Sequence, residues 1–427
     1  MSETRPSLFA DRRIWVMAAY GFFSGLPLPL SGFTFRLWLS EGHLSLGLIG
    51  LTANIGLAYS LKFLWSPVLD QAAPPWGLQL LGRRRGWLMA VQPIMAGAAA
   101  LLALSHPDSA PALALGAAAL VAFLSASQDI VIDAWRIESF PQRQQGAAMA
   151  AYVWAYRIAL LVSGAGAIKA ADLVGWHGAL LGVAALLALA PAVTLFAPEP
   201  AQLQDARPVA FGARLRRAVV EPLRDILSRR GAVTILAFVA LFKLGEAMAG
   251  VMTAPFYTHL GFNRAAIALA NFVPSLGATF AGTALGGLLV ARLGAGRALL
   301  LTGWVQTAAM GMYLWLAVSA GNLHVLVATV VTEAFAEGMA DAAFITFLSG
   351  LCSPAFTATQ YALLSSLAAV GLRTIGGLSG FLAAAVGWTA FYAIAMFAAV
   401  PAMLLMIRIL HRYRPAAAGA AAGAAAA

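Results

Sequence analysis

The chain has 427 residues, of which 61% are hydrophobic and only 10% are charged, whereas soluble domains carry roughly 25% charged residues. A chain this apolar could not hide its surface from water, so the composition excludes an ordinary soluble protein and indicates a membrane protein. The formal net charge is +10. The arginines that carry most of it lie between hydrophobic stretches, where a role in membrane orientation explains them better than nucleic-acid binding.

Twelve hydrophobic segments are long enough to cross a bilayer, since about 20 helical residues span its core of ~30 Å. Arginines gather in alternate connections, and only Arg264 falls in a connection assigned to the outside, so we expect both termini in the cytoplasm. The predicted spans are residues 14–38, 45–69, 87–105, 111–137, 147–171, 177–197, 232–257, 265–290, 298–319, 323–350, 357–385 and 387–410.

The longest polar stretch lies in the middle of the chain and divides the spans into two groups of six. We therefore predict an all-α membrane protein with an N-terminal six-helix bundle (1–197), a basic cytoplasmic linker (198–231) and a C-terminal six-helix bundle (232–414). A low-complexity Ala/Gly tail (415–427) follows, and it holds no core-forming residues. The apolar stretch after residue 13 is too long for a signal peptide, so we expect the first helix to remain.

The two halves repeat each other in sequence. Arg157 precedes Ser163-Gly164 at the same spacing at which Arg373 precedes Ser379-Gly380, and Val174-Gly175-Trp176 matches Val386-Gly387-Trp388. Two parallel six-helix halves are the plan of the major facilitator superfamily, in which the cargo binds between the halves near the middle of the membrane. The two arginines can equally be structural. The glycine pairs Gly21/Gly25, Gly282/Gly286 and Gly376/Gly380 are expected to let helices pack closely.

A further match lies in the cytoplasmic loops. Asp70 and the run Leu81–Arg85 follow the second span, and Gly287-x-Leu289-x-Ala291-Arg292-x-Gly294 follows the eighth. Both resemble the loop signature of the major facilitator superfamily. Arginines in such loops are expected to meet a carboxylate or a helix C-terminus and to latch one conformation, while the alternative is a basic loop that only sets topology. These arginines are Arg83, Arg84, Arg85, Arg292 and Arg297.

Charged residues inside the spans cost about 2.5–3.5 kcal/mol each, so they should face a cavity or a partner. The acids lie at helical spacing on one face in the fourth span (Asp129, Asp133) and the tenth (Glu333, Glu337, Asp341), with Glu246 in the seventh. We predict proton coupling at Asp129 first and Glu337 second, then at Glu246 or Asp341, with Asp133 and Arg136 as a structural pair. The alternative is that these ion pairs only lock helices together.

Several stretches together resemble the AmpG-type muropeptide permeases of Gram-negative inner membranes. They include Ser24–Leu28, Tyr59–Asp70, Ser125–Arg136, Phe242–Ala247 and Phe356–Ser366. The resemblance implies proton-driven import of GlcNAc-1,6-anhydro-MurNAc, with or without its stem peptide, for peptidoglycan recycling. It also implies a link to β-lactam resistance, because the cargo of such permeases controls β-lactamase induction in some bacteria. Eukaryotic acetyl-CoA transporters are distant relatives. The family more often has Gly-Thr where this chain has Ala340-Asp341.

A sugar–peptide cargo needs polar partners in the cavity and a cation for its carboxylates. The candidates are Gln128, Lys62, Arg157, Lys243, Tyr20, Tyr59, Gln306 and Gln360. We expect the transporter to be a monomer. We also expect no enzymatic activity, cofactor or metal, because the sequence shows no nucleophile–base pair, phosphate-binding loop or metal-ligand spacing. The alternatives are a major facilitator transporter of another cargo, such as an acyl-CoA, nucleotide or drug, or a non-transporting membrane sensor.

Overall fold

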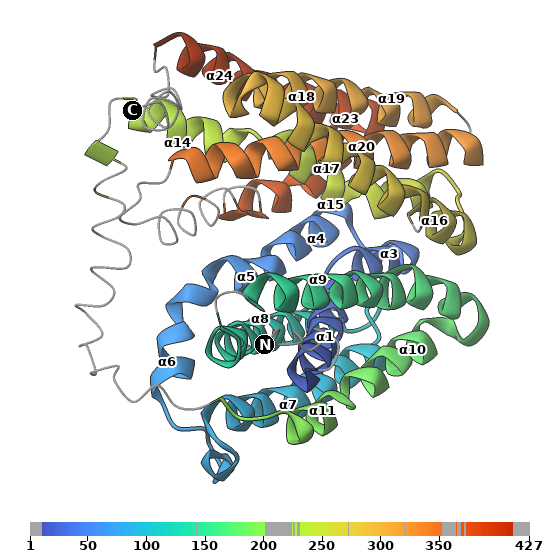
Figure 1. Ribbon diagram of the computed structural model, residues 1–427. Helices are drawn as coiled ribbons and strands as arrows, with labels where there is room; N and C mark the ends of the chain where they lie inside the picture. Colours follow the sequence, from blue (N-terminus) through green and yellow to red (C-terminus); the bar gives the residue numbers. More distant parts are fainter. Residues whose placement is uncertain are drawn as a thin grey trace, which may run out of the picture. The chain divides into compact units, whose positions relative to one another are not determined.

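The computed structural model describes residues 11–141, 144–200, 231–271, 273–319, 321–351 and 373–412, with a few isolated positions at 224, 227, 228, 364, 369 and 370. Over these residues the chain is helical, without β-strands (Figure 1). This confirms the prediction of an all-α protein. The predicted linker falls largely outside the described residues, and the Ala/Gly tail falls there entirely.

The helices group into two compact units, of which the first combines residues 1–209 with residues 251–272. Its elements are α1 (Arg12–Gly25), α2 (Pro27–Leu30), α3 (Phe33–Glu41), α4 (Leu46–Leu51), η2 (Thr52–Gly56), α5 (Leu57–Leu61), η3 (Lys62–Leu64), α6 (Ser66–Gln71), η4 (Leu78–Leu81), α7 (Arg83–Leu104), α8 (Pro111–Ser139), α9 (Gln145–Leu161), the π-helical η6 (Val162–Gly166), α10 (Ala167–Leu187), α11 (Ala190–Phe196) and α16 (Arg264–Asn271). Within this unit α1 packs along α9, and α7 packs on α8 and α10.

The second unit combines residues 210–250 with residues 273–427, so that α15 contributes to both units. Its elements are α14 (Ala232–Leu241), the first part of α15 (Leu244–His259), α17 (Val273–Leu293), α18 (Ala295–Ala309), α19 (Gly311–Val318), α20 (Leu323–Leu351), α22 (Ser379–Val386), α23 (Trp388–Ala398) and α24 (Val400–Arg412). Here α20 packs along α17 and α18.

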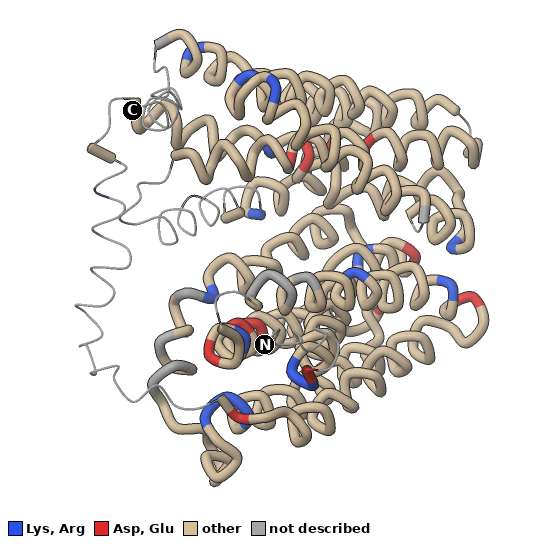
Figure 2. The backbone as a smooth tube through the Cα atoms, viewed as in Figure 1, with Lys and Arg blue, Asp and Glu red and all other residues tan. Residues whose placement is uncertain are grey.

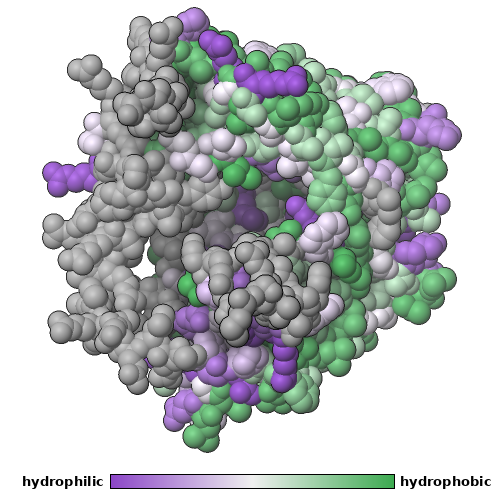
Figure 3. Space-filling model, viewed as in Figure 1, coloured by the Kyte–Doolittle hydropathy of each residue, from purple (hydrophilic) through white to green (hydrophobic). Residues whose placement is uncertain are grey.

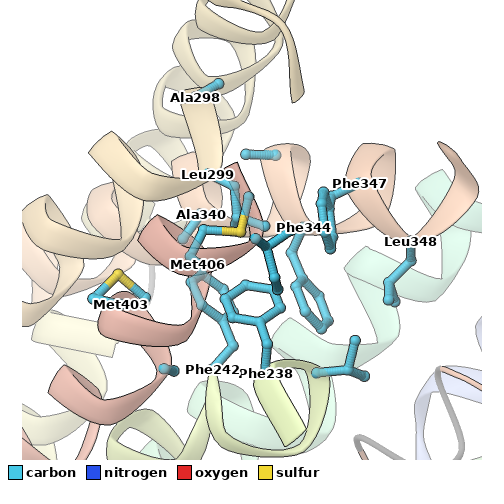
Figure 4. Packing of buried hydrophobic residues seen from close by; sticks show 14 of the residues in the cluster. Phe238, Phe242, Ala298, Leu299, Ala340, Phe344, Phe347, Leu348, Met403 and Met406 are labelled. Atoms are coloured by element: carbon cyan, nitrogen blue, oxygen red, sulfur yellow. The ribbon is translucent and has the colours of Figure 1, made fainter. Parts of the chain in front are cut away.

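Aromatic rings interlock at the core of the second unit (Figure 4). Phe242 and Phe344 stack with ring centroids 5.0 Å apart, and Phe238 meets Phe347 edge to face at 5.5 Å. Met403 of α24 packs into the same cluster. Lipid chains are as apolar as these side chains, so close packing rather than exclusion of water has to hold the helices together.

The surface suits a lipid environment. Much of the visible described surface is hydrophobic in Figure 3, and large apolar side chains such as Trp154 (67% exposed) and Phe196 (70%) point outward. Charged residues gather mainly at helix ends, with a small number midway along helices (Figure 2). The midway charges are the ones that lipid penalises, so they define the candidate site.

Nine helical segments among the described residues are long and apolar enough to cross a membrane. One of them, residues 151–196, is 46 residues long, about twice what one crossing needs, and it is divided at Gly175. The predicted span at 357–385 falls mostly outside the described residues. Twelve crossings therefore stay a prediction.

Several predicted spans are divided into shorter helices, and the first two show the physical causes. In the first, α1 ends at Gly25 and Pro27 starts the short helix α2, because proline lacks the N–H group that would continue the ladder. The second span, expected at 45–69, consists of the short pieces α4, η2, α5, η3 and α6. Glycines at 47, 50 and 56 weaken helix formation there.

Glycines bring helix pairs into close contact. A Cβ atom at Gly25 of α1 would lie 2.5 Å from the carbonyl oxygen of Tyr156 on α9, and one at Gly286 of α17 would lie 2.5 Å from that of Met339 on α20. Gly21 and Gly282 are enclosed in the same way by the backbones of α9 and α20. The packing role predicted for the first two glycine pairs is thus confirmed.

The internal repeat is visible in the backbone. Gly175 has φ 73° and ψ 171°, and its counterpart Gly387 has φ 78° and ψ 167°. Likewise Gly82 precedes α7 with φ 96° and Gly294 precedes α18 with φ 78°. These left-handed conformations favour glycine. Matching turns at matching places support the two copies that the sequence pattern indicated.

The end of the first span also matches the end of the seventh. The amides of residues 42, 43 and 44 donate to the carbonyls of residues 38, 40 and 39, and those of residues 260, 261 and 262 donate to the carbonyls of 256, 258 and 257. This register makes Ser40 and Thr258 equivalent residues. Their hydroxyl groups bond to each other at 2.9 Å.

Gly286→Ala should lower the free energy of unfolding by about 1–3 kcal/mol, because the added methyl overlaps the α20 backbone. Its neighbour provides the control, since a Cβ atom at Gly287 meets nothing within 4 Å and alanine favours the helix by up to ~1 kcal/mol. Thermal unfolding of the purified variants in detergent measures both effects. Equal melting temperatures for the two variants would contradict this account of the packing.

Candidate functional site

The first unit places Asp129 of α8 beside α1. The hydroxyl group of Ser24 donates a hydrogen bond to its carboxylate, and the side chains of Lys62 and Asp133 both act on it electrostatically. Asp129 is neither fully buried nor fully exposed. Partial desolvation favours the neutral acid while a nearby cation favours the carboxylate, so both protonation states have support at this position.

Asp133 lies one turn further along α8 and is shared by two cations. Its oxygens lie 3.9 Å from Nζ of Lys62 and 3.7 Å from a guanidinium nitrogen of Arg136. Ion pairs of this length and exposure are weak, at about 0–1 kcal/mol. The contact expected between Asp133 and Arg136 is present, and its structural role stays a prediction. Lys62 is held loosely enough to act on Asp129 as well.

Three tyrosines interact with Asp129. Tyr59 of α5 and Tyr152 and Tyr156 of α9 each interact electrostatically with its carboxylate. Tyr59 was among the predicted cargo ligands, whereas the sequence analysis missed Tyr152 and Tyr156. The available signal was their spacing of four residues, which places both on one face of α9.

Two other predicted cargo ligands are buried. Tyr20 has no exposed surface and meets Trp135 edge to face with centroids 5.3 Å apart. Gln128 is also fully buried, and its side-chain amide donates to the Phe23 carbonyl at 3.3 Å. Packing and an interhelical hydrogen bond account for both positions in this structure. Their contact with cargo stays a prediction.

The second unit gathers charge around Lys243, at the junction of α14 and α15. Its ammonium group lies 3.0 Å from both carboxylate oxygens of Glu246 and also pairs with Asp341 of α20. Gln306 of α18 donates to Glu246 at 2.5 Å. The charge of Lys243 is therefore matched by two acids, and a cargo carboxylate would have to displace one of them.

The remaining two acids of α20 border this group. Glu333 and Glu337 interact electrostatically with Lys243 and Glu246, yet neither lies within ion-pair distance of Lys243. Acids spaced one helical turn apart disfavour simultaneous ionisation. The structure thus brings all three predicted acids of the tenth span to one charged cluster, which we call the Lys243 cluster: Lys243, Glu246, Glu333, Glu337 and Asp341.

Other predicted site residues lie elsewhere. Arg157 is exposed on the face of α9 that also exposes Trp154 and Ile158. Arg373 is half-buried in the second unit and engages a neighbouring group. Gln360 lies outside the described residues, as does the side chain of Asp70. The roles of these four residues stay predictions.

The arginines in the first turn of α7 join the ends of three helices. The Arg84 guanidinium bonds the Glu138 carboxylate at the end of α8 at 2.6 and 3.0 Å. The backbone amides of Arg84 and Arg85 donate to Glu199 at 2.8 and 3.0 Å, which caps the N-terminus of α7. The Arg85 side chain donates to two carbonyls at the end of α11. Arg83, Arg292 and Arg297 are exposed, and a gating role for these arginines stays a prediction.

Arg264 forms the densest polar contact of the first unit. Its guanidinium bonds both carboxylate oxygens of Glu41 at 2.6–3.0 Å, donates to the Ala171 carbonyl at 2.8 Å and lies over the Trp176 ring at 5.1 Å. The Trp176 indole also donates to Glu41 at 2.6 Å. Hydrogen bonding to Glu41 raises the pKa of Arg264, so the pair stays ionic. These contacts tie α16 to α3 and α10.

Comparison with characterised proteins finds relatives along nearly the whole chain. The chain is 39% identical over 409 residues to the anhydromuropeptide permease of Escherichia coli (strain K12), covering 95% of this chain and 82% of that protein. It is 31% identical over 402 residues to the putative transporter AmpG 4 of Rickettsia conorii, covering 94% and 97%. A family model described as acetyl-coenzyme A transporter 1 matches residues 13–113.

Solved structures share the fold at low sequence identity. The nucleoside transporter NupG matches with a TM-score of 0.70 at 14% identity, covering 94% of this chain and all of that one. The peptide transporter POT, in complex with sulfate, matches with a TM-score of 0.70 at 12% identity, covering 96% of each chain. At these identities the likeness establishes the fold and leaves the cargo open.

Lys243→Met should destabilise the protein by about 1–3 kcal/mol, because it leaves the partly buried acids Glu246 and Asp341 without their cation. Lys169→Met is the control, since Lys169 is 61% exposed and pairs with Asp172 at 3.4 Å, a contact worth about 0–1 kcal/mol. Thermal unfolding in detergent measures both. The double variant with Glu246→Gln should recover part of the loss, and a Lys243→Met protein as stable as Lys169→Met would show that the cluster is not a stabilising ion pair.

Proposed function

Because the chain belongs to the anhydromuropeptide permease family of the major facilitator superfamily, we propose that it imports GlcNAc-1,6-anhydro-MurNAc, with or without its stem peptide, from the periplasm to the cytoplasm in symport with protons. The observation that carries the proposal is 39% identity to an anhydromuropeptide permease over 95% of this chain. The chain is a multi-pass protein of the bacterial inner membrane.

The proposed topology has twelve spans with both termini in the cytoplasm and two six-helix halves. Support comes from the repeated turns at Gly82 and Gly294 and at Gly175 and Gly387, and from the arginine asymmetry of the loops. In this topology the Arg264–Glu41 contact lies on the periplasmic side and the Arg84–Glu138 contact on the cytoplasmic side.

Asp129 is the proposed proton carrier. Ser24 stabilises its carboxylate by a hydrogen bond, Lys62 stabilises the charge, and partial burial opposes it. Alternating access changes the water around such an acid, so it can take up a proton on one side and release it on the other. Asp133, shared between Lys62 and Arg136, is the structural partner in this proposal.

The Lys243 cluster supplies the second candidate carrier. Glu337 lies in the middle of the α20 stripe and outside ion-pair distance of Lys243, so protonation leaves the Lys243–Glu246 pair intact. Glu246 and Asp341 are reserve candidates, because both already neutralise Lys243.

A second candidate cargo is an acyl-coenzyme A, since the family model of acetyl-coenzyme A transporter 1 matches residues 13–113. The longer and closer match to the anhydromuropeptide permease favours the muropeptide.

Membrane vesicles that carry the protein should accumulate radiolabelled GlcNAc-1,6-anhydro-MurNAc when the outside is acidic, and a protonophore should abolish the accumulation. Acetyl-coenzyme A tests the second cargo in parallel. Binding of the disaccharide without any uptake would identify a sensor instead. If the vesicles neither accumulate nor exchange the disaccharide, the muropeptide proposal fails.

Asp129→Asn should lower pH-driven uptake at least about tenfold, since the amide keeps the Ser24 contact but carries no exchangeable proton. Exchange of labelled for unlabelled cargo without a gradient should survive. Asp108→Asn is the control, because Asp108 is an exposed loop acid. Full pH-driven accumulation by both Asp129→Asn and Glu337→Gln would make these acids structural and move the coupling site to Glu246 or Asp341.

A further inference from the structure

We propose that Tyr152 and Tyr156, together with the Asp129 carboxylate, form the subsite that binds a pyranose ring of the cargo. This inference rests on the proposed function, because it names the part of the muropeptide that the first unit recognises. It rests on two observations. Two stacked tyrosines are partly exposed, and both interact electrostatically with the Asp129 carboxylate, which accepts a hydrogen bond from Ser24.

The two tyrosine rings form a platform. They lie four residues apart on α9 and stack with centroids 5.9 Å apart and an interplanar angle of 24°. Both residues are partly exposed, unlike a tyrosine pair enclosed in a core. Each of two stacked rings keeps an outer face that its neighbour does not cover, and each ring carries a hydroxyl group.

Close helix packing fixes the platform in place. A Cβ atom at Gly25 of α1 would lie 2.5 Å from the Tyr156 carbonyl oxygen, and one at Gly21 would overlap the Tyr152 backbone. The backbone that carries the rings therefore cannot move toward α1. A rigid aromatic surface binds a ligand at low entropic cost.

Hydrogen-bonding groups border the platform. Asp129 accepts from Ser24 and still has further lone pairs, and Tyr59, Tyr152 and Tyr156 all act on its carboxylate. A pyranose ring has one face of C–H groups and a rim of hydroxyl groups. The C–H face matches the tyrosine platform, and the rim matches the carboxylate and phenol groups.

The second tyrosine pair of the chain shows what a packing role looks like. Tyr313 and Tyr392 stack at 4.7 Å with an angle of 11°, and their exposed fractions are 2% and 0%. That pair has almost no surface for a ligand. Partial exposure beside Asp129 separates the α9 pair from such a core contact.

The test compares leucine and phenylalanine variants in vesicle uptake of labelled GlcNAc-1,6-anhydro-MurNAc. Tyr156→Leu and Tyr152→Leu should each raise KM about three- to tenfold, the effect of losing one aromatic contact. Phenylalanine variants, which keep the ring, should stay within about twofold. Trp154→Leu is the matched control, since it removes an aromatic ring 67% exposed on the outer face of the same helix.

The outcomes separate the two proposals. If wild-type vesicles take up no disaccharide, the proposed function fails first. If wild-type uptake is normal and the leucine variants keep the KM of Trp154→Leu, the pyranose subsite is refuted. A second experiment measures how well stem peptide alone, or a nucleoside, competes with the labelled disaccharide. If either competitor loses affinity in the leucine variants while the disaccharide keeps its own, the assignment is also overturned.

A measurement on the wild-type protein tests the same proposal if the variants fail to fold. Saturation-transfer NMR of GlcNAc-1,6-anhydro-MurNAc that carries its stem peptide, with wild-type protein in nanodiscs, should show more magnetisation transferred to the sugar-ring C–H protons than to the stem-peptide protons. Equal or reversed transfer would contradict stacking on the tyrosines.

Discussion

Lipid gives a charged side chain no water to replace a missing partner, and this constraint organises the interior of both units. Asp129 is matched by Ser24 and Lys62, and Lys243 by Glu246 and Asp341. Each charge then fixes the helices that carry its partners. Among the acids of the Lys243 cluster, Glu246 and Asp341 pair directly with Lys243, whereas Glu333 and Glu337 do not.

Close packing supplies the geometry that the charges need. Glycines on α1 and α17 allow the backbones of α9 and α20 to approach to van der Waals contact. Helix α9 carries Tyr152 and Tyr156, and α20 carries the row of acids. The glycines that let these helices pack closely therefore also determine where these side chains lie. Sites carried on rigid elements keep their geometry more accurately than sites on loops.

The sequence was sufficient for what has a period or a strong local preference. The all-α fold, the repeat, the glycine contacts and the grouping of the α20 acids followed from spacing alone, as Gly175 and Gly387 illustrate. It did not reveal the broken second span, where short glycine-interrupted pieces keep the hydropathy of one helix. It also missed Tyr152 and Tyr156, since only tertiary contact with Asp129 separates them from ordinary span residues, and it could not foresee that Tyr20 would be fully buried.

The hydrogen bond between Ser40 and Thr258 has a consequence for the symmetry of the chain. These residues are equivalent in the internal repeat, so the contact joins a position to its own copy. A contact of that kind is self-complementary, as at the two-fold axis of a homodimer. The segments around these two residues thus meet within one polypeptide as two copies of one segment meet in a symmetric dimer.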